Sequence, residues 1–136
     1  MFPRKRIPLM VRDVMSQPPV TIDMTVSVRD AARLMCEKRI GSLLVVDKEG
    51  RLRGILTERD VLCAAGKDVM NTPVWTIMTE NPVTIKPEAS IDEAIKKMAE
   101  IGIRHLPVVD KEGRPVGIIS VRDILGSIRL FVELFK

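Results

Sequence analysis

Residues 54–60 read Gly-Ile-Leu-Thr-Glu-Arg-Asp, and residues 117–123 read Gly-Ile-Ile-Ser-Val-Arg-Asp. The two stretches lie 63 positions apart, and the similarity extends outward from them without a gap. Between residues 14–62 and residues 77–125, 23 of 49 aligned positions are identical. The chain therefore contains an internal repeat, and this sets its architecture. A unit of about 60 residues is only marginally stable alone, so we expect the two copies to pack together about a pseudo-two-fold axis.

Each copy contains the same succession of predicted elements, β-α-β-β-α, which predicts an α+β fold. Ser27 and Ser90 are expected to cap the first helix of each copy, because an acidic residue follows three positions later, as in a capping box. Thr57 and Ser120 stand at the start of the second helix. The predicted strands of the two copies are, in order, residues 20–22 and 83–85, 43–46 and 106–109, and 54–56 and 117–119. The apolar positions expected to face a core from the first helices are Val28, Ala31, Ala32 and Met35, and Ile91, Ala94, Ile95 and Met98.

The composition is that of a soluble globular protein. Of the 136 residues, 46% are hydrophobic and 29% charged, and no apolar run approaches the roughly 20 residues that span a bilayer. Pro3 and Pro8 interrupt the region where a signal peptide would need an unbroken apolar stretch. We therefore expect a cytoplasmic protein with no membrane partner. Its predicted domains are residues 1–72, a tail and the first repeat, and residues 73–136, the second repeat and a C-terminal helix.

The positive charge of the chain is concentrated at one end. The formal net charge is +4, and Arg4, Lys5 and Arg6 supply three of those charges. The chain has no tyrosine and few other aromatic side chains on which nucleic-acid bases could stack. We therefore expect no nucleic-acid partner, although a basic tip that binds nucleic acid or another protein remains an alternative to a solvated tail.

No constellation of catalytic or metal-ligating residues is evident. Cys36 and Cys63 match neither a metal-binding spacing nor a disulfide framework, and we predict that both are small buried residues. The single histidine, His105, cannot be linked to either cysteine from the sequence. We therefore predict a protein that is not an enzyme, with no catalytic residue, no metal site and no cofactor.

The segment 121–135 continues with apolar residues at helical spacing, beyond the length of the matching helix in the first copy. Two interpretations stay open: the extension closes the core, or it joins a partner chain. The apolar residues concerned are Ile124, Ile128, Phe131, Val132 and Phe135.

Thr57 and Ser120 mark a place suited to a phosphate. In each copy a strand ends and a helix begins there, so backbone N–H groups and the positive end of the helix dipole lie beside the hydroxyl. Arg59 and Arg122, two positions on, could add a bidentate contact.

Asp60 and Asp123 carry two alternative roles. An ionised carboxylate accepts hydrogen bonds, which suits the adjacent hydroxyls of a ribose. The pairs Thr57 with Asp60 and Ser120 with Asp123 also have the spacing of a capping box, which needs no ligand. The two roles can coexist.

The repeated motifs, taken together, resemble the CBS (cystathionine beta-synthase) domain pair, or Bateman module. Each copy carries Met-Ser/Thr, Pro-Val-Thr-Ile, a capped helix, Val-Val-Asp and Gly-Ile-(Leu/Ile)-(Thr/Ser)-x-Arg-Asp. The resemblance implies a stand-alone regulatory module of two βαββα units packed sheet to sheet. It implies two clefts that bind AMP, ADP or ATP, with S-adenosylmethionine as a further possibility. It also implies a homodimer, shaped as a flat disc, that signals to an unknown regulated protein.

The resemblance further implies which residues bind the ligand. From the first copy they are Thr21, Ile22, Ile40, Gly41, Ser42, Thr57, Arg59 and Asp60, and from the second Thr84, Ile85, Ile103, Arg104, His105, Pro107, Ser120, Arg122 and Asp123. Because Arg104 and His105 add positive potential, we expect unequal clefts. The stronger nucleotide site is predicted to be built mainly from Thr84, Ile103, Arg104, His105, Ser120 and Asp123. A half-buried His105 with a structural role is the alternative for that residue.

Two other functions remain open. The chain could bind nucleic acid or protein through its basic tip and its C-terminal helix, or it could be a dimerisation scaffold that has lost its nucleotide ligand.

Overall fold

The helices and strands follow the predicted order, with short additions before each repeat. The computed structural model describes residues 9–134, so Arg4, Lys5, Arg6 and Phe135 lie outside the described residues. The first repeat contains β1 (Thr21–Asp23), α2 (Val28–Lys38), β2 (Ser42–Val46), β3 (Leu52–Thr57) and α3 (Glu58–Gly66). The second contains α4 (Ile91–Ile101), β5 (His105–Val109), β6 (Pro115–Ser120) and α5 (Val121–Leu134). The additions are α1 (Val11–Val14), the 3-10 helix η1 (Val74–Thr76) and β4 (Thr79–Glu80).

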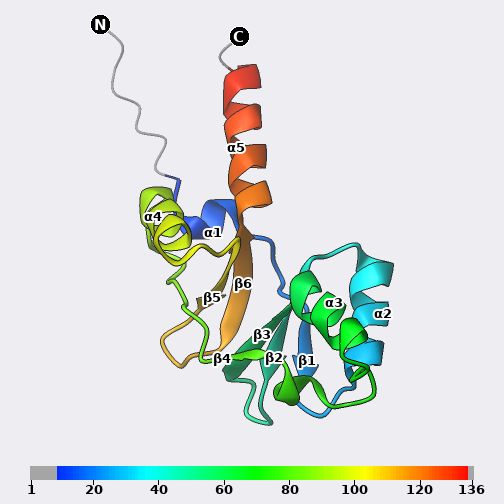
Figure 1. The fold of residues 1–136 in the computed structure, drawn as a ribbon. Helices are drawn as coiled ribbons and strands as arrows, with labels where there is room; N and C mark the ends of the chain where they lie inside the picture. Colours follow the sequence, from blue (N-terminus) through cyan, green and yellow to red (C-terminus); the bar gives the residue numbers. More distant parts are fainter. Residues whose placement is uncertain (1–8, 135–136) are drawn as a thin grey trace, which may run out of the picture.

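The strands of both repeats lie in the middle of the molecule, with α4 on one side and α2 and α3 on the other (Figure 1). The first sheet has the order β1-β2-β3-β4, in which β1 and β2 are parallel and the other neighbours antiparallel. In the second sheet β5 and β6 are antiparallel, with His105 opposite Ser120. The predicted α+β fold with two related halves is therefore confirmed.

The predicted strand at residues 83–85 is reduced to a single bridge between Ile85 and Val108. The cause is one substitution between the copies. In the first repeat the Leu44 N–H donates to Val20 O at 3.2 Å. Pro107 occupies the position of Leu44 in the second repeat, and a proline has no N–H to donate. The prediction of a strand at residues 83–85 was wrong because this hydrogen bond is missing from its pairing with β5.

Ser27 and Ser90 are the predicted N-caps, but the return bond of a capping box, from the serine N–H to the acidic side chain, is not formed at either residue. Ser27 Oγ accepts a hydrogen bond from Asp30 N at 3.0 Å, and Ser90 Oγ accepts one from Glu93 N at 3.1 Å. An N-cap of this kind typically contributes about 1 kcal/mol. The two caps fix where α2 and α4 begin, and so which of their faces turn toward a core.

Each repeat is completed by a short segment that precedes the other repeat. We call residues 10–16 the first leader and residues 73–80 the second leader. In the first leader, Val11 N donates to Ala89 O and Ser16 N to Ile118 O, both at 2.8 Å and both in the second repeat. In the second leader, Val74 N donates to Val26 O at 2.8 Å, and β4 pairs with β3 of the first repeat. The leaders are therefore exchanged between the repeats.

The exchange explains why both copies contain a methionine in the leader and a glycine in the strand. A Cβ on Gly117 would come within 2.5 Å of Met15 Sδ and 3.0 Å of Ser16 O. A Cβ on Gly54 would press equally on Met78 and lie 2.9 Å from Thr79 O. Only glycine lets the leader backbone approach the strand so closely.

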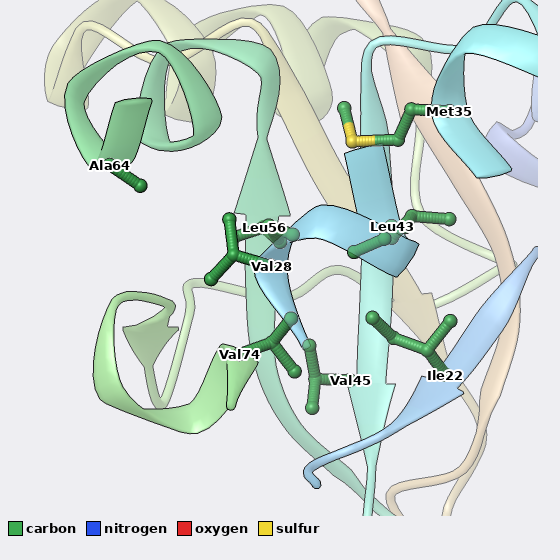
Figure 2. Packing of buried hydrophobic residues seen from close by; sticks show 9 residues of the cluster. Ile22, Val28, Met35, Leu43, Val45, Leu56, Ala64 and Val74 are labelled. Atoms are coloured by element: carbon green, nitrogen blue, oxygen red, sulfur yellow. The ribbon is translucent and has the colours of Figure 1, made fainter. Parts of the chain in front are cut away.

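Two hydrophobic cores hold the halves. Val74 of the second leader is fully buried in the first core, and Val11 of the first leader is fully buried in the second core. The first core (Figure 2) contains Ile22, Val28, Ala31, Met35, Leu43, Val45, Leu56, Ala64 and Val74. The second contains Val11, Ile85, Ala94, Met98, Leu106, Val108, Ile119 and Ile124. Of the predicted core positions, Ile95 is instead exposed, and Ala32 and Ile91 are only partly buried.

One expectation needs correction, and one open alternative is narrowed. Cys36 and Cys63 are both free and exposed rather than buried. Beyond Ile124, α5 leaves Ile128 50% and Val132 53% exposed, so at these two positions it closes no core. Figure 1 shows α5 projecting away from the sheets.

Candidate functional site

A large pocket lies where the two repeats meet. Its volume is about 1270 Å³. The first repeat and its leader line it with Ser16, Gln17, Pro18, Pro19, Val20, Ala32, Met35, Cys36, Arg39, Ile40, Gly41, Ser42, Leu44, Glu58 and Val61. The second repeat contributes Arg104, His105, Ile118, Ser120, Val121, Arg122, Asp123, Leu125, Gly126 and Arg129. We call this pocket the Ser120 cleft.

The start of α5 forms the polar centre of the Ser120 cleft. Asp123 Oδ2 accepts hydrogen bonds from the N–H and the hydroxyl of Ser120, both at 2.9 Å, and Asp123 N donates to Ser120 Oγ at 3.1 Å. Ser16 of the first leader donates from its hydroxyl to Asp123 Oδ1 at 3.0 Å. Asp123 is therefore a capping residue that also holds the exchanged first leader.

The backbone at this helix start is already partly occupied. Val121 N donates to Arg104 O at 3.0 Å, and Asp123 N donates to Ser120 Oγ. Two of the first three N–H groups of α5 thus have partners within the chain. A phosphate bound here must therefore draw chiefly on side chains, of which the arginines are the strongest donors.

The same cap recurs around Thr57. Asp60 Oδ2 accepts from Thr57 N at 2.8 Å and from Thr57 Oγ1 at 3.0 Å, and Asp60 N donates to Thr57 Oγ1 at 3.4 Å. The capping interpretation therefore holds in both copies. Each residue of the Ser120 cleft has a counterpart 63 positions away in the other copy of the repeat. We call this second set of positions, which includes Thr57, the Thr57 region.

His105 faces the first repeat across the Ser120 cleft. A Cβ on Gly41 would lie 3.5 Å from His105 Nε2 and 3.6 Å from Glu58 Oε1, so these side chains converge on Gly41. Burial lowers the pKa of His105 below its usual value, although the Glu58 and Asp123 carboxylates act in the opposite direction and Arg104 adds to the lowering. His105 is therefore neutral near pH 7, and it is half-buried as the structural alternative predicted.

Positive side chains dominate the Ser120 cleft. Four arginines line it against two carboxylates, and they come from both repeats. The charged lining residues are Arg39, Arg104, Arg122 and Arg129, with Glu58 and Asp123. In a partly enclosed site such an excess attracts anions.

The structure brings together about half of the predicted site residues. The Ser120 cleft contains Ile40, Gly41, Ser42, Arg104, His105, Ser120, Arg122 and Asp123. Outside it lie Thr21, Ile22, Thr57, Arg59, Asp60, Thr84, Ile85, Ile103 and Pro107. Ile22 and Ile85 belong to the cores, whereas Thr57, Arg59, Asp60 and Ile103 belong to the Thr57 region. Thr84 and Ile103 were expected beside Ser120 but do not line the cleft; Ile103 packs against the second core instead.

Several lining residues were not predicted from the sequence, among them the stretch 16–20, Glu58 and Arg129, whereas the segment from Arg39 to Ser42 was expected to line the cleft. The repeated Met-Ser/Thr motif marked the first as important but gave no sign of its exchange. Arg129 follows Arg122 by seven residues, which places both on one helix face. Arg39 stands where the second copy has Gly102, a contrast visible in the alignment of the copies.

Neither a metal site nor a membrane-spanning helix is found among the described residues. Across residues 9–134, no three His, Cys, Asp or Glu side chains gather as a metal ion would require. Within the same residues, every helix is too short or too polar to cross a bilayer.

The fold closely matches those of solved proteins. The CBS domain pair of protein MJ0100, solved with 5′-methylthioadenosine and S-adenosyl-L-methionine, superposes with a TM-score of 0.83 and is 34% identical. The match covers 92% of this chain and 97% of that one. The CBS domain protein PAE2072 from Pyrobaculum aerophilum, complexed with AMP, gives a TM-score of 0.84 at 27% identity over 93% of this chain and 98% of that one.

Sequence comparisons point the same way. An uncharacterized 17.7 kDa protein of Acidianus ambivalens is 36% identical over 99 residues, which cover 73% of this chain and 60% of that protein. Several curated relatives carry enzyme names, and the chain spans only 16% to 24% of their length. The model of the CBS domain matches twice, at residues 11–67 and 65–130. With two matches that together span both repeats and their leaders, the chain belongs to the CBS domain family.

Proposed function

We propose that the protein is a regulatory module that binds an adenosine-containing nucleotide in the Ser120 cleft. The observation that carries the proposal is the junction of Ser16, Ser120 and Asp123, where one carboxylate at a helix start meets the exchanged first leader inside a large pocket. AMP in one relative, and S-adenosylmethionine and methylthioadenosine in another, support this ligand class.

The geometry suits the three parts of a nucleotide. Asp123 can accept from a ribose hydroxyl, since a carboxylate offers about four acceptor sites and the cap and Ser16 use only some of them. Arg122 and Arg104 suit the phosphate. Apolar side chains such as Val20 and Leu44 line the same pocket and suit the faces of the base.

Binding would couple the two repeats. A ligand held by Asp123 and by residues 39–42 at once contacts both halves, so it favours the arrangement in which both can reach it. Such a module alters a partner through this shift rather than through chemistry of its own. The identity of the regulated partner is a separate question, for which affinity purification with and without nucleotide is the direct approach.

A thermal-shift titration tests the binding proposal. A ligand at about 100 times its Kd adds about 2.7 kcal/mol of stability. For a chain of this size that raises Tm by roughly 8–10 °C. We expect such a rise with at least one of AMP, ADP, ATP and S-adenosylmethionine. An unchanged Tm with all four would contradict the proposal.

We also propose that α5 pairs with a second copy of the chain. Val121, Leu125, Ile128 and Val132 are exposed and follow one another at spacings of four, three and four residues, the pattern of a helix–helix seam. Light scattering should give a dimer mass, and Ile128→Glu with Val132→Glu should give a monomer that keeps the fold. A wild-type monomer at high concentration would exclude the pairing.

A further inference from the structure

We propose that the Ser120 cleft selects nucleoside di- and triphosphates over AMP and S-adenosylmethionine, and that Arg39 and Arg129 make this selection. The inference rests on the proposed function, since it names which member of the adenosine class the cleft prefers.

The charge of the cleft is the first support. Four arginines face two carboxylates, and His105 adds no charge near neutral pH. A triphosphate carries several negative charges that can meet these arginines. S-adenosylmethionine instead carries a sulfonium and an ammonium group against a single carboxylate, so its net charge is about +1 and the same arginines attract it far less.

Arg129 has no charged counterpart in the first repeat. The helix α5 has 14 residues, whereas α3 has 9 and ends at Gly66, the position that corresponds to Arg129. Arg122, Gly126 and Arg129 lie on one face of α5 and all line the cleft. A Cβ on Gly126 would meet no atom within 4 Å, so space is left between the two arginines.

The position of Arg129 suits the far end of a phosphate chain. Six residues separate it from Asp123, which corresponds to about 9 Å along the helix at about 1.5 Å per residue. Side chains on a helix lean toward its N-terminus, so the guanidinium of Arg129 is directed back along the face that carries Arg122. A nucleotide with its ribose at Asp123 and its phosphates extended along this face would bring its β- and γ-phosphates toward Arg129.

Arg39 occupies a backbone conformation that favours glycine. It ends α2 with φ of 54°, in the left-handed region, and the second repeat has Gly102 there with φ of 76°. A residue with a side chain is strained in this conformation. Of the two equivalent positions, only that of Arg39 lines the cleft, and only there does a side chain occupy the strained conformation. The strain lowers the stability of the fold.

The size of the cleft agrees with a long ligand. Pockets for small molecules usually measure about 300–1,000 Å³. The Ser120 cleft measures about 1270 Å³, which leaves room beyond a nucleoside monophosphate.

The test is titration calorimetry with ATP, ADP, AMP and S-adenosylmethionine, without added divalent cations, on the wild type and three variants. The variants are Arg129→Gln, Arg39→Gly and the control Arg33→Gln. Arg33 is exposed on α2, pairs with Asp30 at 3.5 Å and does not line the cleft, so its substitution removes the same charge elsewhere.

We expect ATP and ADP to bind at least about tenfold more tightly than AMP, because each added phosphate gains charge-assisted contacts. Arg129→Gln and Arg39→Gly should each weaken ATP binding about five- to tenfold and AMP binding less than about twofold, and Arg33→Gln should change neither. ATP affinity should also fall more steeply with salt than AMP affinity. Arg39→Gly should unfold at the same temperature as the wild type or higher, which separates its binding role from a structural one.

Three outcomes would overturn the inference: AMP or S-adenosylmethionine binding as tightly as ATP, equal weakening of AMP and ATP in the arginine variants, or equal weakening by Arg33→Gln. Each of these leaves nucleotide binding itself intact. Failure of all four ligands to bind the wild type would instead remove the proposed function.

Discussion

The Ser120 cleft and the Thr57 region descend from the same repeated sequence and share the same helix cap, yet they differ in charge. The positions of the Thr57 region hold two arginines against three carboxylates, where the Ser120 cleft holds four against two. The charged residues of the Thr57 region are Arg59, Arg104, Glu58, Asp60 and Glu80, of which Arg104 and Glu58 also line the Ser120 cleft. The local fold survives in both places, so the cap alone does not define a nucleotide site.

The two regions also differ in the size of their side chains. Ala32 lines the Ser120 cleft, and the larger Ile95 takes its place in the Thr57 region. Gly126 of the Ser120 cleft corresponds to Cys63, and Arg129 to Gly66. A duplicated unit can thus keep its stability determinants in both copies while one copy gains the space and the cations that an anionic ligand needs.

Substitution of the two capping aspartates gives the sharpest contrast. Asp123→Ala should weaken ATP binding about 10- to 100-fold, since a hydrogen bond to a charged group contributes about 1.5–3 kcal/mol. Asp60→Ala should leave the affinity nearly unchanged. Each variant also loses a capping interaction, so both should lose about 1 kcal/mol of unfolding free energy. Calorimetry and urea unfolding measure the two effects, and equal affinities in the two variants would abolish the distinction between the regions.

The strand glycines provide a second contrast. Gly117→Ala and Gly54→Ala should each destabilise the fold by about 1–3 kcal/mol, because the new Cβ overlaps the leader methionine and crowds the leader backbone. Only Gly117→Ala displaces Ser16, so only this variant should also bind ATP more weakly at a temperature where it remains folded. Loss of affinity in Gly54→Ala alone would reverse the assignment.

The two native cysteines report on the two regions separately. Cys36 lines the Ser120 cleft, and Cys63 belongs to the Thr57 region. Because both are exposed, a soluble alkylating reagent should modify both in the free protein. Saturating ATP should slow alkylation of Cys36 in proportion to occupancy and leave that of Cys63 unchanged, as followed by peptide mass spectrometry. Protection of Cys63 would instead place the ligand in the Thr57 region.

The smallest expected effect concerns pH. Burial depresses the pKa of His105 in the folded protein, so its contribution to stability is fully present above the unfolded pKa of about 6.5. That contribution is lost as the pH falls from this value through the folded pKa, because the unfolded chain then binds the proton first. Urea midpoints between pH 8 and pH 5 should fall more for the wild type than for His105→Gln. Parallel curves would show that His105 does not titrate differently on folding.

The repeat made most of the fold predictable. The patterns of capped helices, buried strands and turns appear twice in the sequence, so each prediction for one copy is supported by the other copy. The prediction of a strand at 83–85 failed because one proline removes one backbone N–H, an effect that hydrophobic periodicity does not reveal. The prediction that both cysteines are buried failed because it relied on residue type, whereas both side chains are exposed.

The site was harder to predict than the fold. The caps at Thr57 and Ser120 were visible from spacing, but the partner of each cap depends on which leader reaches it. Residues 16–20 approach Ser120 only through contacts between segments about 100 positions apart in the chain, such as that of Ser16 with Asp123. Sequence spacing carries no information on contacts of this kind.

The exchange of leaders limits how the chain could be divided. If the chain were cut between residues 67 and 68, each fragment would carry the leader that completes the other fragment. The two fragments should therefore reassemble when they are mixed. Alone, the first fragment would present the uncovered edge of β3, and unpaired strand edges favour aggregation. Neither half is therefore a self-sufficient building block.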